Sequence, residues 1–240
     1  MFDAIDAGYW SAARAGIAAL PPSVLTPVAK AELYTAKGSP VVDLYSLQTL
    51  LAEAPELPEA DQLAALAALQ DWLASSTKLP LASATARRIM PHGPENAAIM
   101  LLTEAPTLED FAAGQPIGGE SWELAKRMLA AIKIVPEQAY SASLSCFNAP
   151  GARMSPADRE ACAEIARQHI KLAKPARLLL LGEGPAQALL GKPLVQARGH
   201  AYKVEGVRTV ATFHPRHLIN QPSNKSLAWK DLLLLMEDES

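Results

Sequence analysis

The chain has 240 residues, of which 50% are hydrophobic and 20% charged, with a formal net charge of −3 at pH 7. This balance is that of an ordinary globular protein and excludes disordered and fibrous classes. Two cysteines, Cys146 and Cys162, are too few for a disulfide framework, and no run of 18 apolar residues indicates a membrane span. Since the first residues also lack a signal-peptide pattern, we expect a cytoplasmic protein with no membrane partner.

The charges are unevenly distributed along the chain. Residues 1–75 hold three basic and nine acidic residues, whereas residues 175–230 hold eight basic and two acidic residues. A basic segment of this kind can bind a polyanion locally. The alternative is that these lysines and arginines only solvate surface loops, because a basic patch alone is a weak indication of nucleic-acid binding.

Residues 1–80 predict a helical N-terminal extension, interrupted by proline- and glycine-rich turns. Within it, an amphipathic helix is expected from Asp61 onward. Its apolar residues recur at helical spacing, at Leu63, Leu66, Leu69, Trp72 and Leu73. The acidic character of this extension is compatible with a protein partner.

The pattern changes in the second part of the chain, where residues 94–240 predict a separate α/β domain. Short apolar runs predict strands at 98–102, 139–144, 178–182 and 207–212, with helices at 122–132, 155–171, 185–190 and 227–236. The alternation favours a three-layer α/β/α fold with a short, mostly parallel, four-stranded sheet. Ser155 is expected to cap the second of these helices, followed by Pro156 at its first position.

Candidate functional residues follow the predicted strands, where sites of parallel sheets gather. Glu104 could orient a water molecule or stabilise a cationic sugar, and His214 could donate a hydrogen bond to an oxyanion. Taken singly, each residue fits an ordinary loop position better than a catalytic one. Cys146 and Cys162 are either half of a metal site or buried apolar fillers.

Motifs in one colinear order, from Ala98 to Asp231, give these residues a context. The stretches are Thr103-Glu104-Ala105-Pro106-Thr107, Glu109-Asp110, Gly114-Gln115-Pro116-Ile117-Gly118-Gly119, a Pro-containing run between Cys146 and Pro156, Cys162, Leu181-Gly182, Arg198-Gly199 and Thr212-Phe213-His214-Pro215-Arg216-His217-Leu218-Ile219. Together they resemble the uracil-DNA glycosylase superfamily, and within it the thermophile-type, family 4 iron–sulfur branch.

The resemblance implies base-flipping DNA repair chemistry, in which uracil is extruded from DNA and its N-glycosidic bond is hydrolysed. By position, Glu104 matches the acid that assists the water and the sugar cation, and His214 matches the residue that stabilises the departing base. The resemblance also implies which residues form the base pocket and which bind DNA. The pocket set is Ala105, Pro106, Ile117 and Ala142, and the DNA-binding set is Arg216, Leu218 as the wedge, Lys225 and Arg198.

Several positions depart from the family pattern. Thr103 and Thr107 replace glycines, and these β-branched side chains are expected to crowd the pocket. Ile117 stands where the family has a stacking phenylalanine, and Ala142 lies near its base-reading asparagine. The serine that follows the His-Pro pair is Arg216. These changes leave open an active glycosylase with altered preference, a silent DNA-binding relative, or a protein-interaction module.

The family's four cluster cysteines are not all present. Cys146 and Cys162 keep the family separation of 16 residues, but residues 74–80 hold no upstream pair. Since a [4Fe–4S] cluster needs four ligands, we expect no cofactor and no iron–sulfur cluster. Apolar packing is expected to replace it, with Leu79, Leu81, Ile89 and Met90 over Cys146, Phe147 and Cys162.

Overall fold

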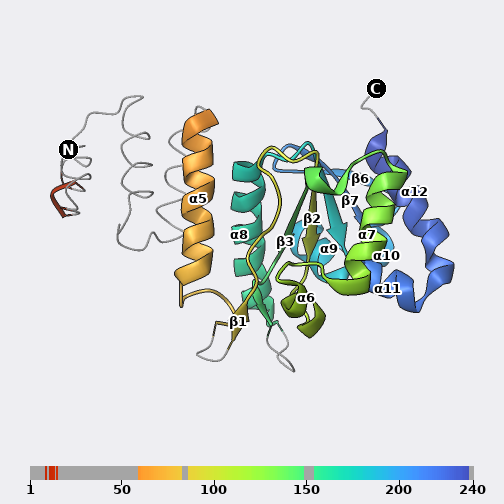
Figure 1. Ribbon diagram of the computed structural model, residues 1–240, viewed down its shortest axis with the longest axis horizontal. Coiled ribbons are helices and arrows are strands. Elements are labelled where there is room, and N and C mark those ends of the chain that lie inside the picture. Colours follow the sequence, from red (N-terminus) through yellow and green to blue (C-terminus); the bar gives the residue numbers. More distant parts are fainter. Residues whose placement is uncertain are drawn as a thin grey trace. The chain divides into compact units, whose positions relative to one another are not determined.

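The computed structural model describes Tyr9, residues 11–13, Ala15, and residues 59–82, 86–148 and 154–237. The chain divides into two compact units, Met1–Ser76 and Thr77–Ser240 (Figure 1). Most of the predicted N-terminal extension lies outside the described residues. Its described part contains helix α5 (Glu59–Ser75), which confirms the helix predicted from Asp61 onward. The apolar residues predicted for its inner face are buried, namely Leu66, Leu69, Trp72 and Leu73.

The second unit is built on a five-stranded sheet with the order β3-β2-β5-β7-β6. The strands are β2 (Ile99–Thr103), β3 (Ala139–Ser143), β5 (Arg177–Leu181), β6 (Ala201–Val204) and β7 (Val207–Thr212). All neighbours are parallel except β6 and β7, which form an antiparallel hairpin. The prediction of four strands therefore has to be corrected to five. Strand β6 lies at the sheet edge with only one of its four residues buried, so it carries no buried apolar run that would reveal it.

Alternate residues of the central strands face two separate apolar layers, as expected for a sheet covered on both sides. Met100 and Leu102 belong to the layer beneath α8 (Pro156–Ala173), α9 (Glu183–Leu190) and α10 (Leu194–Ala197). Ile99 and Leu101 belong to the layer beneath α7 (Gly119–Ala131) and α12 (Lys225–Met236). Figure 1 shows α8 and α7 on opposite sides of the sheet. The predicted three-layer α/β/α architecture is thus confirmed.

Short elements complete this unit. They are α6 (Leu108–Ala113), α11 (Pro215–Asn220), the 3₁₀ turns η1 (Pro136–Gln138) and η2 (Pro222–Asn224), and an antiparallel ribbon of β1 (Arg87–Arg88) with β4 (Phe147–Asn148). The predicted cap of α8 is present, because Asp158 N–H donates to the Ser155 hydroxyl at 3.1 Å and Pro156 is the first helical residue. Within the described residues, no helix combines the length and apolar character that a membrane crossing requires.

Candidate active site

A pocket of about 390 Å³ opens at the carboxyl edge of the sheet, where β2, β5 and β7 end. It is lined by Thr103, Glu104, Ala105, Leu181, Gly182, Glu183, Leu194, Phe213, His214, Arg216 and His217. The chain passes from β2 to β3 on one side and returns to β5 on the other side, so the strand order reverses between β2 and β5. Open α/β sheets bind ligands at such reversal points, and the volume falls within the usual range for small-molecule sites.

Glu104 reaches this pocket from the end of β2. Its backbone carbonyl accepts from Ser145 N–H at 3.0 Å, which holds the loop after β2 against the loop after β3. The exposed carboxylate lies against Gly184 near the amino end of α9, where a Cβ on Gly184 would come within 2.5 Å of Glu104 Cδ. The positive end of the α9 dipole favours a negative charge at this place. Glycine at position 184 leaves the room that this carboxylate occupies.

His214 enters the pocket from the end of β7, as the residue that caps α11. Its Nδ1 accepts from Arg216 N–H at 3.1 Å, so the neutral ring carries its proton on Nε2. The pKa of His214 is lowered to about 4, chiefly by burial and in addition by the nearby Arg216 cation, while Asp110 acts in the opposite direction. At neutral pH the side chain is therefore an uncharged hydrogen-bond donor through Nε2.

The buried carboxylate of Asp110 joins the segments that carry these two residues. Its oxygens accept from Thr107 N–H and Gly118 N–H, each at 2.7 Å, and from the Thr107 hydroxyl at 2.7 Å. Arg216 donates to the same carboxylate at 3.1 Å and to Thr107 Oγ1 at 3.0 Å. The loop after β2, the turn before α7 and the first turn of α11 are thus tied to a single acid.

A second buried acid, Asp231 of α12, supports the β7 side of the pocket. It accepts from the Thr212 hydroxyl and from Arg198 Nε, each at 2.7 Å. The Arg198 guanidinium lies 4.1 Å from the centre of the Phe213 ring, and His217 stacks on that ring at 4.8 Å with an angle of 15°. Phe213 and His217 therefore place aromatic surface in the pocket, held in position by Arg198.

Comparison with known proteins agrees with this geometry. The profile of the uracil DNA glycosylase superfamily matches residues 90–234, which is more than half of the chain. The chain belongs to this superfamily. It is 26% identical over 141 residues to a protein named type-4 uracil-DNA glycosylase from Archaeoglobus fulgidus, covering 54% of this chain and 71% of that protein. It is 24% identical over 177 residues to one of the same name from Pyrobaculum aerophilum, covering 69% of this chain and 90% of that protein.

In this superfamily member Glu104 and His214 line the same pocket. Only one of the four residues implied for the base pocket lies there with them. Ala105 lines the pocket, whereas Pro106, Ile117 and Ala142 are buried and do not line it. Ile117 and Ala142 belong instead to the two apolar layers of the core.

The two threonines that replace family glycines lie in different surroundings. Thr103 lines the pocket, and its buried Oγ1 has no hydrogen-bond partner within the described part of the chain. Thr107 does not crowd the pocket. It serves as the cap of α6 and as a partner of Asp110 and Arg216.

The residues implied for DNA binding differ in their availability. Lys225, the first residue of α12, is exposed, as a phosphate ligand has to be. Arg216 and Arg198 are engaged in ion pairs with Asp110 and Asp231 at 3.1 and 2.7 Å. Leu218 is only 1% exposed, because it forms the inner face of the short helix α11. A wedge has to project into the base stack, so in this conformation Leu218 does not occupy the place expected of it.

Sequence reasoning missed several lining residues. Phe213, His217, Leu181, Gly182 and Leu194 all face the pocket. Phe213 and His217 lie four residues apart around His214, and this spacing of two ring-bearing residues is the signal that could have indicated them. Leu194 comes from α10, whose approach to the strand ends depends on tertiary packing.

The expectation that this protein lacks an iron–sulfur cluster is contradicted by the comparisons, because both relatives are named type-4 enzymes, the branch that carries such a cluster. Cys146 and Cys162 are buried, and burial raises their thiol pKa values to about 11 and about 12. Within the described residues, no group of three or more His, Cys, Asp or Glu side chains is placed to hold a metal ion. The residues present supply two of the four thiolates of a complete site.

The segment before β2 is held beside Cys146 mainly by backbone pairing. Ile89 N–H donates to the Cys146 carbonyl at 2.9 Å, continuing the ribbon of β1 and β4. Arg88 lies over the Phe147 ring at 4.8 Å. The apolar residues expected here include Leu79 and Ile89, which are both buried.

Proposed function

We propose that this protein is a DNA glycosylase that hydrolyses the N-glycosidic bond of uracil, or of a related damaged base, in the pocket at the ends of β2, β5 and β7. The observation that carries the proposal is the placement of Glu104 and His214 in one pocket. They come from strands that are not adjacent in sequence, and their chemistry fits the two charges that develop when a glycosidic bond breaks. Its substrate is then a nucleotide extruded from single- or double-stranded DNA.

His214 acts on the departing base. When the C1′–N bond breaks, its electron pair moves onto the base and negative charge collects on the base oxygens. A neutral imidazole that keeps its proton on Nε2 donates a hydrogen bond to such an oxygen. The Arg216 N–H at 3.1 Å from Nδ1 fixes this tautomer, and the lowered pKa of about 4 keeps His214 uncharged at neutral pH.

Glu104 acts on the sugar and on water. Its carboxylate stabilises the cationic sugar and accepts a proton from the water whose oxygen forms the new bond to C1′. The products are an abasic sugar and the free base, which takes a proton from solvent. The exposed position of Glu104 beside the open pocket gives water access to it.

The His217 ring, backed by the Phe213 ring, provides a flat surface for the extruded base, because Arg198 and His217 already cover the two faces of Phe213. The stacked arrangement of the two rings, with ring centres 4.8 Å apart, is fixed by the Arg198 guanidinium on the Phe213 ring. Bases stack on aromatic side chains with little dependence on sequence. This surface would supply the stacking that Ile117, 1% exposed in the core, does not offer.

The test is incubation of the purified full chain with single- and double-stranded oligonucleotides that contain one uracil, with abasic sites scored after alkaline cleavage. We expect cleavage by the wild type and a loss of about 10²–10⁴-fold in the single-turnover rate for Glu104→Gln and for His214→Gln. Glu137→Gln and His200→Gln, both at exposed positions that do not line the pocket, are the matched controls and should retain activity. DNA binding without abasic-site formation on uracil or damaged-base substrates would refute the proposal in favour of a binding module.

A further inference from the structure

The side chain expected as the wedge of this site is buried. When a nucleotide leaves a duplex, an apolar side chain commonly enters the base stack beside it. Leu218, the residue expected in this role, is 1% exposed and faces inward from α11. A protein that extrudes nucleotides from duplex DNA therefore needs another apolar side chain, one that projects from the surface beside the pocket.

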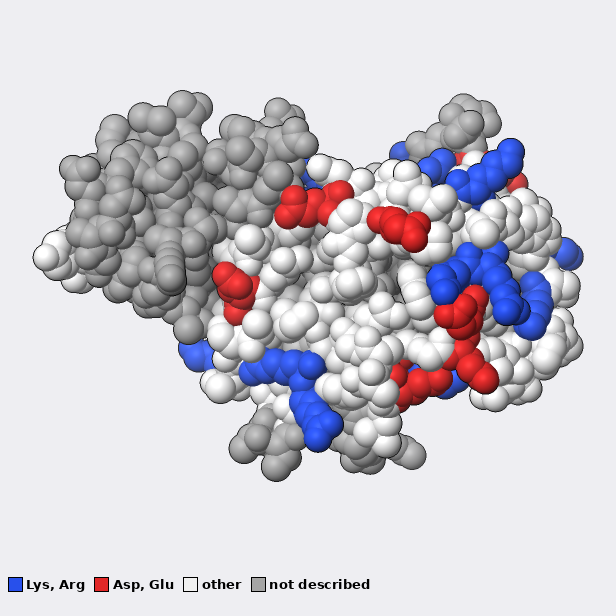
Figure 2. All heavy atoms as spheres, in the orientation of Figure 1, with Lys and Arg blue, Asp and Glu red and all other residues white. Residues whose placement is uncertain are grey.

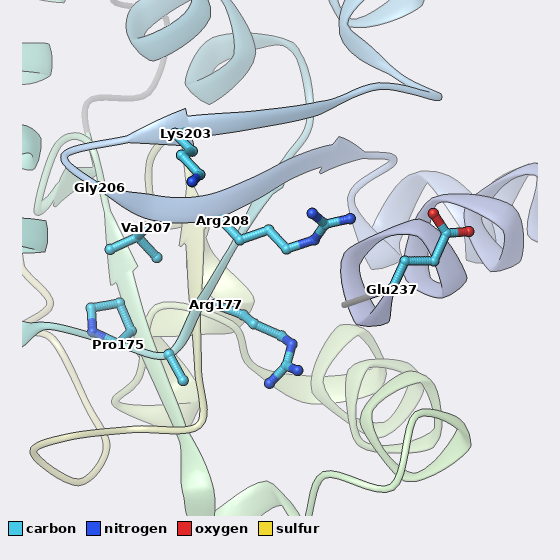
Figure 3. A pocket seen from close by; sticks show the side chains of 8 residues that line it. Pro175, Arg177, Lys203, Gly206, Val207, Arg208 and Glu237 are labelled. Carbon is cyan, nitrogen blue, oxygen red and sulfur yellow. The ribbon is translucent and has the colours of Figure 1, made fainter. Parts of the chain in front are cut away.

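A second pocket, at the amino ends of β5 and β7, is not the place to look for it (Figure 3). Among the described residues that line it, none is aromatic and none is a strongly exposed large apolar residue. In the pocket at the carboxyl edge, by contrast, the His217 ring backed by Phe213 offers a stacking surface. An extruded base is therefore expected at the carboxyl edge, and the wedge has to lie beside that pocket.

The two most exposed large apolar residues described in the second unit both adjoin the pocket at the carboxyl edge. Leu108 is 76% exposed and follows the loop that carries Ala105, a lining residue. Val195 is 82% exposed and directly follows Leu194, which also lines the pocket. They belong to opposite faces of the sheet, because α6 contacts α7 whereas α10 contacts α9. Leu108 and Val195 are therefore the two candidates for insertion into DNA.

Leu108 adjoins the helix from which the wedge was expected. The hydroxyl of the preceding residue, Thr107, accepts from Arg216 Nη2 at 3.0 Å, and Arg216 lies in the first turn of α11. Figure 1 shows α6 and α11 at the same end of the sheet. The one-turn helix α10, which carries Val195, contacts α9 and β7 instead. Of the two candidates, Leu108 is the one beside the place expected for the wedge.

The backbone that carries Leu108 is firmly held. The N–H and the hydroxyl of Thr107 both donate to the buried Asp110 carboxylate at 2.7 Å. A side chain on such a base loses little further freedom when it enters a base stack. The adjacent acid, Glu109, accepts from Glu120 N–H at 3.1 Å, so its charge is held at the start of α7, where the helix dipole favours it.

We propose, on the basis of the glycosylase function given above, that Leu108 enters the base stack of duplex DNA when the target nucleotide is extruded. Leucine is one of the residues that act as apolar wedges in other DNA-binding proteins. In this role it fills the gap and slows the return of the nucleotide. A single strand has no partner base to leave, so Leu108 has no gap to fill there. Leu108 is thus a positioning residue, and the chemistry of Glu104 and His214 does not depend on it.

Single-turnover cleavage by the full chain of matched duplex and single-stranded oligonucleotides, each with one uracil, tests this role. Leu108→Ala should lower the rate on the duplex by about tenfold or more and change the rate on the single strand by less than about twofold, because only the duplex has to be unstacked and unpaired. The Tm should stay at that of the wild type, since this side chain is largely exposed. Leu108→Met, which keeps an apolar side chain of similar length, should retain most of the duplex rate.

Extrusion can also be measured without cleavage. A 2-aminopurine placed beside the uracil in the duplex becomes more fluorescent when its stacking partner leaves. In the Glu104→Gln background, which keeps the strand intact, binding should produce this rise, and Leu108→Ala should reduce it. If the wild type does not cleave but the rise depends on Leu108, the glycosylase function fails while the role of Leu108 stands.

Two matched variants identify the residue. Val195→Ala removes a similarly exposed apolar side chain on the other side of the pocket and should keep the wild-type ratio of duplex to single-strand rates. Leu218→Ala should lower the Tm, because it empties a buried position, and should not slow the duplex more than the single strand. The proposal is overturned if Leu108→Ala slows both substrates alike, or if Val195→Ala or Leu218→Ala shows the selective loss on the duplex. It is also overturned if binding to the duplex produces no rise in fluorescence.

Discussion

Replacing Gly184 by Ala should reduce catalysis without weakening the fold. An ideal Cβ at this position lies 2.5 Å from Glu104 Cδ, 2.6 Å from its Cγ and 2.8 Å from its Oε2. Ordinary contacts between carbon atoms are about 3.5–4.0 Å, so the Glu104 carboxylate has to move by about 1 Å. A displacement of that size in a catalytic group costs about 10²-fold in rate.

The effect on stability should be small or of opposite sign. The atoms displaced belong to the exposed end of a flexible side chain, which can rotate away from the methyl group that the substitution adds to α9. In the helix, alanine is favoured over glycine by roughly 0.5–1 kcal/mol. We therefore expect an unchanged or slightly higher Tm together with a single-turnover rate reduced about 100-fold.

A double-mutant comparison tests the cause of the loss. In a Glu104→Ala background the side chain that clashes is absent, so adding Gly184→Ala should have no further effect on the rate. The assay is abasic-site formation from a uracil-containing oligonucleotide under single-turnover conditions. Full activity of Gly184→Ala, or an equal loss in both backgrounds, would refute the inferred contact between position 184 and Glu104.

Three further outcomes are expected. Burial lowers the pKa values of His169 and His214 to about 4 in the folded chain, whereas the same histidines have a pKa near 6.5 in the unfolded chain. Between these two pH values the unfolded chain therefore binds more protons than the folded chain. The free energy of unfolding should therefore fall as the pH falls from about 6.5 to about 4, and His169→Gln should reduce this slope in denaturant titrations. Lys225→Ala should weaken binding to any DNA sequence and reduce the slope of log affinity against log salt concentration by about one. Arg216→Ala should also lower the Tm, because it leaves Asp110 without its ion-pair partner. Equal Tm values for the two variants would contradict this distinction. Phe213→Leu removes the ring on which His217 stacks, so it should raise the KM for a uracil-containing strand far more than it lowers the Tm. An unchanged KM would exclude Phe213 as the support of a stacking surface.

The sheet was predictable because its two central strands, β2 and β5, consist almost entirely of consecutive apolar residues. Ile99–Thr103 and Arg177–Leu181 are buried along almost their whole length, and such runs bounded by polar turns have few other interpretations. The juxtaposition of Glu104 and His214 followed from the same property, since parallel strands end at one edge. Edge strand β6 was missed because only one of its four residues is buried.

The parts of the site that were missed depend on side-chain environment rather than on position in a motif. Leu218 occupies a motif position, yet helix α11 turns it inward, and the sequence contains no signal for that orientation. The sequence predicts Arg216 to be available for DNA, but its side chain donates to Asp110, which is 106 residues away along the chain. The surface charge is similarly mixed, with Lys126 and Glu123 paired at 2.7 Å on α7 and basic and acidic groups adjacent in Figure 2. A segment's net charge therefore does not locate a binding face.

Asp110 has a consequence for the order of events on DNA. Because it accepts hydrogen bonds from Thr107, Gly118 and Arg216, both walls of the pocket are assembled before any substrate arrives. Little further ordering is then needed on binding, and the unstacking of the target nucleotide becomes the main barrier ahead of chemistry. With the proposed glycosylase activity, we expect the rate to follow the strength of the pairing that holds the uracil, so that it is fastest in a single strand, slower opposite guanine and slowest opposite adenine.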